Sequence, residues 1–141
     1  MRSTLQLMMI AALAALLSLN LSCGSSRKTL VMEEGWELIG ETKVNFIKDK
    51  DEVLVDSTKL YTMLRFKVED REIRLEEVKV YFTNGDKLEP NIAEAIKPAE
   101  YSKDIELSYE GKAINKIQFK YRTTGSLLKG RAAILIFGKR Y

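Results

Sequence analysis

The sequence predicts an all-β fold, an antiparallel β-sandwich of two sheets with about seven or eight strands, preceded by a helical signal peptide. Three observations support this prediction. Apolar and polar residues alternate along several segments, turn residues separate these segments, and the densest apolar run lies near the N-terminus. With 141 residues, 2 prolines and a single cysteine, the chain suits one compact domain.

Residues 1–22 have the arrangement that is typical of a secretory signal peptide. Arg2 supplies a positive charge, residues 7–17 are all apolar, and small polar residues follow them. A membrane-spanning helix needs ~20 consecutive apolar residues, and this run is about half as long. We therefore expect this segment to be removed and the mature protein to be exported.

The end of this segment carries a second pattern. Residues 19–24, Leu-Asn-Leu-Ser-Cys-Gly, resemble the lipobox of bacterial lipoproteins. Ser22 fits the small position of that motif, whereas Asn20 stands where the motif carries Leu. The resemblance implies that Cys23 is lipidated and becomes the new N-terminus, and residues 23–29 then form a flexible tether.

Lipidation would hold the protein in the bacterial cell envelope, because several acyl chains together bind a membrane almost permanently. The membrane is therefore the first expected partner. Gly24, rather than Asp, follows the cysteine. By analogy with bacterial lipoproteins this implies the outer membrane, with the domain facing the periplasm or the cell surface. Cleavage after Gly24 or Ser26, which releases a soluble protein, is the alternative.

Residues 30–141 form the predicted sandwich domain, and its strands are assigned from the alternation of apolar residues. In residues 60–69, Leu60, Leu64 and Phe66 share one face and charged residues occupy the other. Residues 131–140 are apolar on both faces, which predicts a strand in the middle of a sheet. The other predicted strands are 37–47, 52–56, 78–83, 92–96, 102–109 and 117–122, with turns at 84–86, 110–112 and 123–126.

The segment 92–96 has an alternative interpretation. Pro90 and Pro98 flank it, and proline is accepted in the first turn of a helix and stops a helix that precedes it. A single helical turn is therefore the alternative to a strand or crossover loop.

Five stretches of the predicted domain carry a family resemblance. They are 36–40 (WELIG), Val44 with 49–51 (DKD), 80–85 (VYFTNG), 114–121 (INKIQFKY) and 130–132 (GRA). Together they are similar to small secreted bacterial β-sandwich domains of no assigned function. The resemblance extends from Trp36 to the C-terminus and implies a fold and an envelope or extracellular setting. It implies no catalytic residue.

Composition excludes several kinds of chemistry. The sequence has no histidine, which rules out Ser-His-Asp and Cys-His nucleophiles and His-ligated metals. The 23 basic and 20 acidic residues give a net charge of +3, without the clustered basic excess that nucleic-acid binding needs. We expect no cofactor and no nucleic-acid partner.

Two sets of residues are candidates for a binding surface. Tyr61, Tyr81 and Tyr101 are aromatic residues with a polar tip, which suits either ligand recognition or packing between strands. The second set alternates with apolar residues along one predicted strand. Its members, Lys116, Lys120 and Arg122, share a face with Gln118 and could meet anionic lipid or an acidic polysaccharide, or keep the sheet soluble.

Asp49, Asp51 and Glu52 form the densest acidic cluster in a predicted loop, and calcium prefers several carboxylate oxygens. The cluster lacks the glycine and the closing glutamate of a calcium-binding loop, so a solvated hairpin turn is the favoured interpretation and no metal is expected.

These observations favour a non-catalytic, lipid-anchored domain of the cell envelope that binds an envelope protein or a cell-wall component. A carbohydrate-binding module of the β-sandwich type is the alternative. A hydrolase that uses two carboxylates is the least favoured hypothesis, because the spacing of the acidic residues nominates no pair.

Overall fold

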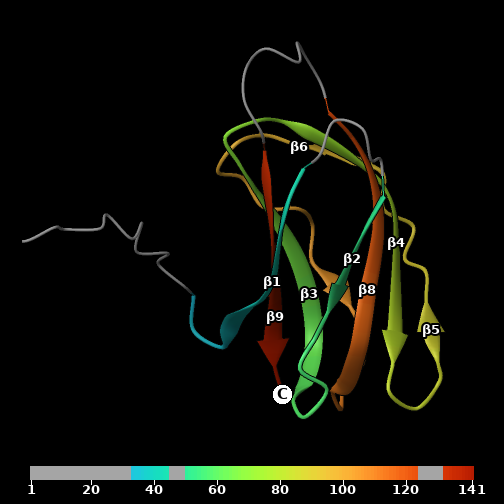
Figure 1. Cartoon of the computed structure of the whole chain (residues 1–141). Helices are drawn as coiled ribbons and strands as arrows, with labels where there is room; N and C mark the ends of the chain where they lie inside the picture. The colour runs from blue at the N-terminus through green and yellow to red at the C-terminus, as the bar shows by residue number, and fades with distance from the viewer. Residues whose placement is uncertain (1–32, 45–49, 124–131) are drawn as a thin grey trace, which may run out of the picture. The chain divides into compact units, whose positions relative to one another are not determined.

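The computed structural model describes residues 33–44, 50–123 and 132–141, which all belong to one compact unit, Met32–Tyr141. Nine antiparallel strands occupy these residues, and no helix lies among them that is long and apolar enough to cross a membrane (Figure 1). The strands are β1 (Trp36–Lys43), β2 (Lys50–Leu54), β3 (Leu60–Glu69), β4 (Ile73–Phe82), β5 (Lys87–Leu88), β6 (Glu94–Ile96), β7 (Ile105–Glu106), β8 (Lys112–Thr123) and β9 (Ala133–Arg140).

Part of the sequence prediction lies outside the described residues. This holds for the signal peptide 1–22, the lipidation site Cys23 with the tether 23–29, and Asp49 of the acidic cluster.

The strands form one strongly curled half-barrel sheet in the order β1-β9-β3-β8-β4-β5. Three further strands pair off this path, β2 with β8, β6 with β4 and β7 with β3. The all-β prediction is confirmed, but the two separate sheets that it specified are not found. The physical reason lies in β3: most of it pairs with β9, while Leu60 and Tyr61 at its start pair with Ala113 and Lys112 of β8. Long strands twist, so one sheet curls over its own core.

Most predicted strands are present with shifted ends. The prediction for residues 60–69 matches β3, and the prediction for 92–96 is confirmed in its last three residues, which form the strand β6 rather than a helical turn. Strands β4 and β8 begin well before the predicted 78 and 117, whereas β7 is only two residues of the predicted 102–109. Gly85 and Gly111 have φ angles of 92° and 75°, as the turns predicted at 84–86 and 110–112 require.

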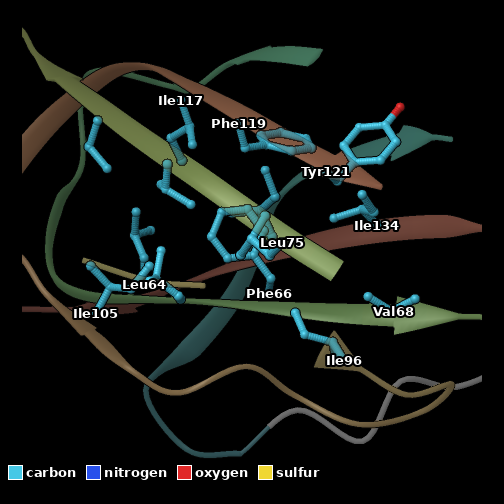
Figure 2. Packing of buried hydrophobic residues seen from close by; sticks show 14 of the residues in the cluster. Leu64, Phe66, Val68, Leu75, Ile96, Ile105, Ile117, Phe119, Tyr121 and Ile134 are labelled. Atoms are coloured by element: carbon cyan, nitrogen blue, oxygen red, sulfur yellow. The ribbon is translucent and has the colours of Figure 1, made fainter. Parts of the chain in front are cut away.

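The core lies on the concave inner face of the sheet (Figure 2). Phe66 of β3 and Phe119 of β8 meet there edge to face, with 5.5 Å between their ring centroids. Strand β9 is buried on both faces: Ile134 and Ile136 belong to the core cluster, and Leu135 and Phe137 between them are also buried. Its predicted central position is therefore confirmed, since β9 pairs with β1 on one side and β3 on the other.

Two glycines allow close approach at the edges of this core. An added Cβ on Gly138 of β9 would lie 2.6 Å from Cδ1 of the Tyr61 ring, so the bare backbone makes room for that ring. An added Cβ on Gly40 of β1 would overlap Cγ1 of Val53 in β2. Glycine therefore lets Tyr61 and Val53 pack directly against the backbone.

Candidate functional site

Strand β8 separates two kinds of side chain. Ile117, Phe119 and Tyr121 point into the core, so the alternating residues point outward. Strands β2 and β4 pair with β8 on its two sides, and their outward residues extend the same surface. We call this surface the outer β8 face; its members are Lys50 and Glu52 of β2, Arg74, Glu77, Lys79 and Tyr81 of β4, and Lys116, Gln118, Lys120 and Arg122 of β8.

One half of the outer β8 face is a hydrogen-bonded network around Glu52. Lys116 Nζ and Gln118 Nε2 donate to Oε2 of Glu52 over 3.1 Å and 2.6 Å. Tyr81 donates its hydroxyl proton to Oε1 of Gln118 at 3.0 Å, and the ammonium of Lys116 lies 5.0 Å from the centre of the Tyr81 ring. The hydrogen bonds from Gln118 and Lys116 lower the pKa of Glu52, which keeps this carboxylate ionised.

The other half of this face carries more positive charge. Lys50 stands directly opposite Lys120, and Arg74 stands directly opposite Arg122. Glu76 accepts from Nε of Arg122 at 2.7 Å and lies 3.7 Å from Nζ of Lys120. The register shifts between Leu75 and Glu77, and this β-bulge brings two acidic residues to the position opposite Lys120.

A groove of about 490 Å³ joins the two halves. Its lining includes charged and amide side chains of all three strands: Lys50, Glu52, Glu77, Lys79, Gln118 and Lys120. The hydrogen bond with Lys79 lowers the pKa of Glu77 and raises the pKa of Lys79, so both are charged at neutral pH. A groove with donors and acceptors at this density suits a polar or charged ligand better than an apolar one.

Tyr81 therefore shares the outer β8 face with Lys116, Lys120 and Arg122 and contacts Lys116, but the other two candidate tyrosines lie elsewhere. Tyr61 is buried in the core, and its hydroxyl donates to Oε1 of Glu37 at 2.5 Å. Burial and this hydrogen bond raise the pKa of Tyr61. The interpretation of Tyr61 as a surface aromatic is wrong, because a β-bulge between Tyr61 and Met63 turns its ring inward and leaves Leu60 45% exposed.

Tyr101 lies over β3 and β9, away from the outer β8 face. Its ring centre is 5.7 Å from that of Phe137. The guanidinium carbon of Arg65 lies 4.0 Å from the ring centres of both Tyr101 and Trp36. Arg65 is buried and pairs with Glu33 at 3.1 Å. The Tyr101 ring therefore holds a buried cation in place.

The acidic candidates do not converge. Asp51 accepts hydrogen bonds from the hydroxyls of Tyr121 and Thr42 at 2.8 Å and 3.3 Å, toward the core side of β2. Glu52, the next residue, points to the outer β8 face. Adjacent residues of a strand face opposite ways, so these two carboxylates cannot share an ion. Among the described residues no group of three or more acidic, cysteine or histidine side chains gathers in a way that could hold a metal.

Sequence reasoning missed several exposed or charged residues. Tyr109 and Tyr141 are 95% and 75% exposed and are the most open aromatic rings of the described chain. The position of Tyr109, directly before the turn at 110–112, is the one signal that could have found it. Lys50 and Arg74 were also missed, because only the strand register shows which residues they face.

Two solved structures are similar to parts of this chain. AlgX of Pseudomonas aeruginosa matches with a TM-score of 0.47 and 12% identity over 74% of this chain, which spans 27% of the AlgX chain. The SPBc2 prophage-derived protein YomS matches with a TM-score of 0.32 and 13% identity, over 72% of this chain and 95% of its own.

No curated protein matches the sequence. A family model does: the one described as a domain of unknown function, DUF2541, matches residues 8–138. The match covers nearly the whole sequence, and the family is described as one of unknown function. The chain thus belongs to the DUF2541 family.

Proposed function

We propose that this protein is a non-catalytic, lipid-anchored domain of the bacterial cell envelope that binds another envelope component through the outer β8 face. One observation carries the proposal. The groove of about 490 Å³ on this face is lined by hydrogen-bonding and charged side chains from three strands, over a core that is apolar and closely packed. Such a rigid sheet can hold a polar surface in a fixed arrangement without itself moving.

The export and the anchor rest on the sequence. The charged start, the apolar run 7–17 and the cysteine at position 23 form the expected order of a lipoprotein leader. With the anchor supplied by lipid, the folded domain itself needs no membrane-binding face. The outer β8 face is then free to meet a partner in the periplasm or at the cell surface.

The state of the carboxylates favours binding over catalysis. A glycoside hydrolase needs one carboxylic acid that keeps its proton near neutral pH. On the outer β8 face, Lys116 and Gln118 engage Glu52, and Lys79 engages Glu77. These contacts lower the pKa of both glutamates, so neither suits the role of a general acid.

A carbohydrate-binding module is the second candidate. The observation that favours it is the run of hydroxyl, amide and carboxylate groups from Tyr81 through Gln118 to Glu52, because sugar hydroxyls both donate and accept hydrogen bonds.

A photo-crosslinking amino acid placed at Gln118 of the full chain tests the proposal in intact bacteria. The matched control places the same group at Lys97, which is exposed and lies outside the outer β8 face. We expect a species of higher mass from position 118 and none from position 97. Equal products from both positions, or no product from position 118, would contradict the proposal.

A further inference from the structure

Four cations form a strip across one end of the outer β8 face. Lys50 lies opposite Lys120, Arg74 lies opposite Arg122, and Lys120 and Arg122 are neighbours on the same face of β8. We call Lys50, Lys120, Arg122 and Arg74 the cationic strip. Like charges that stand directly opposite each other in antiparallel strands destabilise a sheet. This sheet places two such pairs side by side.

The acidic residues nearby offset only part of this charge. Glu76 pairs with both Lys120 and Arg122. Glu77 pairs with Lys79, and the positive charges of Lys50 and Lys120 also help to lower its pKa. Within the described part of the chain, neither Lys50 nor Arg74 forms an ion pair. Lys50 and Arg74 are exposed, and the side chain of Arg122 is 73% exposed. The strip therefore keeps a positive surface that water and ligands can reach.

The strip continues into the groove. Lys50 and Lys120 are members of the strip and also line the groove. The groove lining beyond them includes Glu52, Gln118 and Lys79. A ligand that places a negative group on the strip would extend its remaining parts over neutral and mixed-charge groups. The two halves of the outer β8 face would therefore contact different parts of one ligand, a negative group at the strip and its remaining parts in the groove.

We propose that the cationic strip binds the carboxylates of an acidic polysaccharide, whose hydroxyls occupy the groove. This inference rests on the proposed function and names the class of its ligand. The planar guanidinium groups of Arg74 and Arg122 match carboxylate geometry. An anionic lipid surface fits less well, because the carboxylates of Glu52 and Glu77 would face its headgroups, whereas sugar hydroxyls donate hydrogen bonds to them.

The test compares the full chain with the double variant Lys50→Gln/Arg74→Gln. Neither residue forms an ion pair within the described chain, so the change removes two charges without breaking an ion pair there. The control Lys97→Gln/Lys103→Gln removes the same charge from exposed positions outside the strip. Affinity for polygalacturonate, a polymer of a uronic acid, is measured in non-ionic detergent, with methyl-esterified polygalacturonate as the uncharged probe.

We expect wild type and control to bind polygalacturonate and the double variant to bind about tenfold more weakly, with the difference reduced by added salt. Binding to the methyl ester should be weak in all three. Equal affinity of wild type and double variant, or no affinity of wild type for polygalacturonate, would overturn the inference. Thermal melts show that the variant is folded, and relief of like-charge repulsion should leave it at least as stable as wild type.

A vesicle arm distinguishes the lipid alternative. Partition of wild type and double variant onto phosphatidylglycerol and phosphatidylcholine vesicles is compared with Cys23→Ala added to both, so that no acyl chain holds either protein to the vesicles. Loss of a phosphatidylglycerol preference in the variant, with unchanged polygalacturonate binding, would assign the strip to lipid and overturn our inference. If crosslinking at Gln118 succeeds while polygalacturonate binding fails, only this inference falls; if crosslinking also fails, the proposed function falls with it.

Discussion

The two faces of β8 differ in composition and in what a substitution there should do. On the inner face, Ile117, Phe119 and Tyr121 are almost fully buried and pack against residues of β3 and β4 (Figure 2). On the outer face, Lys116 and Arg122 are solvated and paired with glutamates. One strand of twelve residues thus contributes to the stability of the core on one side and, in our proposal, to ligand binding on the other. The comparison teaches that the two properties can be changed separately.

The largest effect should come from Phe119→Ala. The ring is 2% exposed and meets Phe66 edge to face, so its removal leaves a cavity that costs about 3 to 5 kcal/mol of unfolding free energy. The neighbouring change Gln118→Ala on the outer face should cost under about 1 kcal/mol. Denaturant melts of both variants measure the difference. Equal losses would show that the two faces are not energetically distinct.

A smaller loss of unfolding free energy is expected from a substitution at Gly138, which contacts the Tyr61 ring at the edge of the inner face. Gly138→Ala should destabilise the domain by about 1 to 3 kcal/mol, because the added methyl group overlaps the ring. In the background of Tyr61→Leu, the same alanine should cost less, since the smaller side chain leaves room. A double-mutant cycle measures this coupling. Strict additivity of the two changes would contradict direct contact as the cause.

The hydrogen bond between Tyr61 and Glu37 predicts a pH dependence. It lowers the pKa of Glu37 below its ordinary value of 4.5, with help from Lys59. Because the native pKa is the lower one, the stabilisation is complete above about pH 4.5 and is lost as pH falls through the lowered native value. Tyr61→Phe should cost about 1 kcal/mol at pH 7 and less at pH 3. A cost that is the same at both pH values would contradict this linkage.

The smallest effect on folding is expected for Cys23→Ala, because residues 23–29 are predicted to be a tether. The melting temperature should not change, whereas acyl labelling should disappear and the protein should leave the membrane fraction. Metabolic labelling with a fatty acid and cell fractionation measure both. Unchanged membrane fractionation would refute the lipid anchor.

The sequence predicts much of the sheet and part of the candidate site, and the limit is set by β-bulges. Alternation places Leu64 and Phe66 inward correctly, as it does the inward residues of β8. The same alternation puts Leu60 inward, but the bulge after Tyr61 reverses the order and buries the tyrosine instead. One extra residue in a strand reverses which of the following residues face the core, and the local composition does not predict where such a bulge occurs.

Long-range pairing sets a second limit. The sequence indicates that Lys120 and Arg122 point outward together, yet the cationic strip needs Lys50 and Arg74 from strands far away in the chain. The clamp of Arg65 between Trp36 and Tyr101 likewise joins three distant segments. Such groupings depend on strand order, which here places β2 and β4 on the two sides of β8.

The placement of β9 affects when the sheet can form. This strand is made after the other eight, yet it lies between β1 and β3, which do not pair with each other in the described part of the chain (Figure 1). The ribosome must therefore deliver nearly the whole sequence before either partner can complete its ladder. Until then β1 has no partner strand within the described sheet, and β3 lacks its longest ladder.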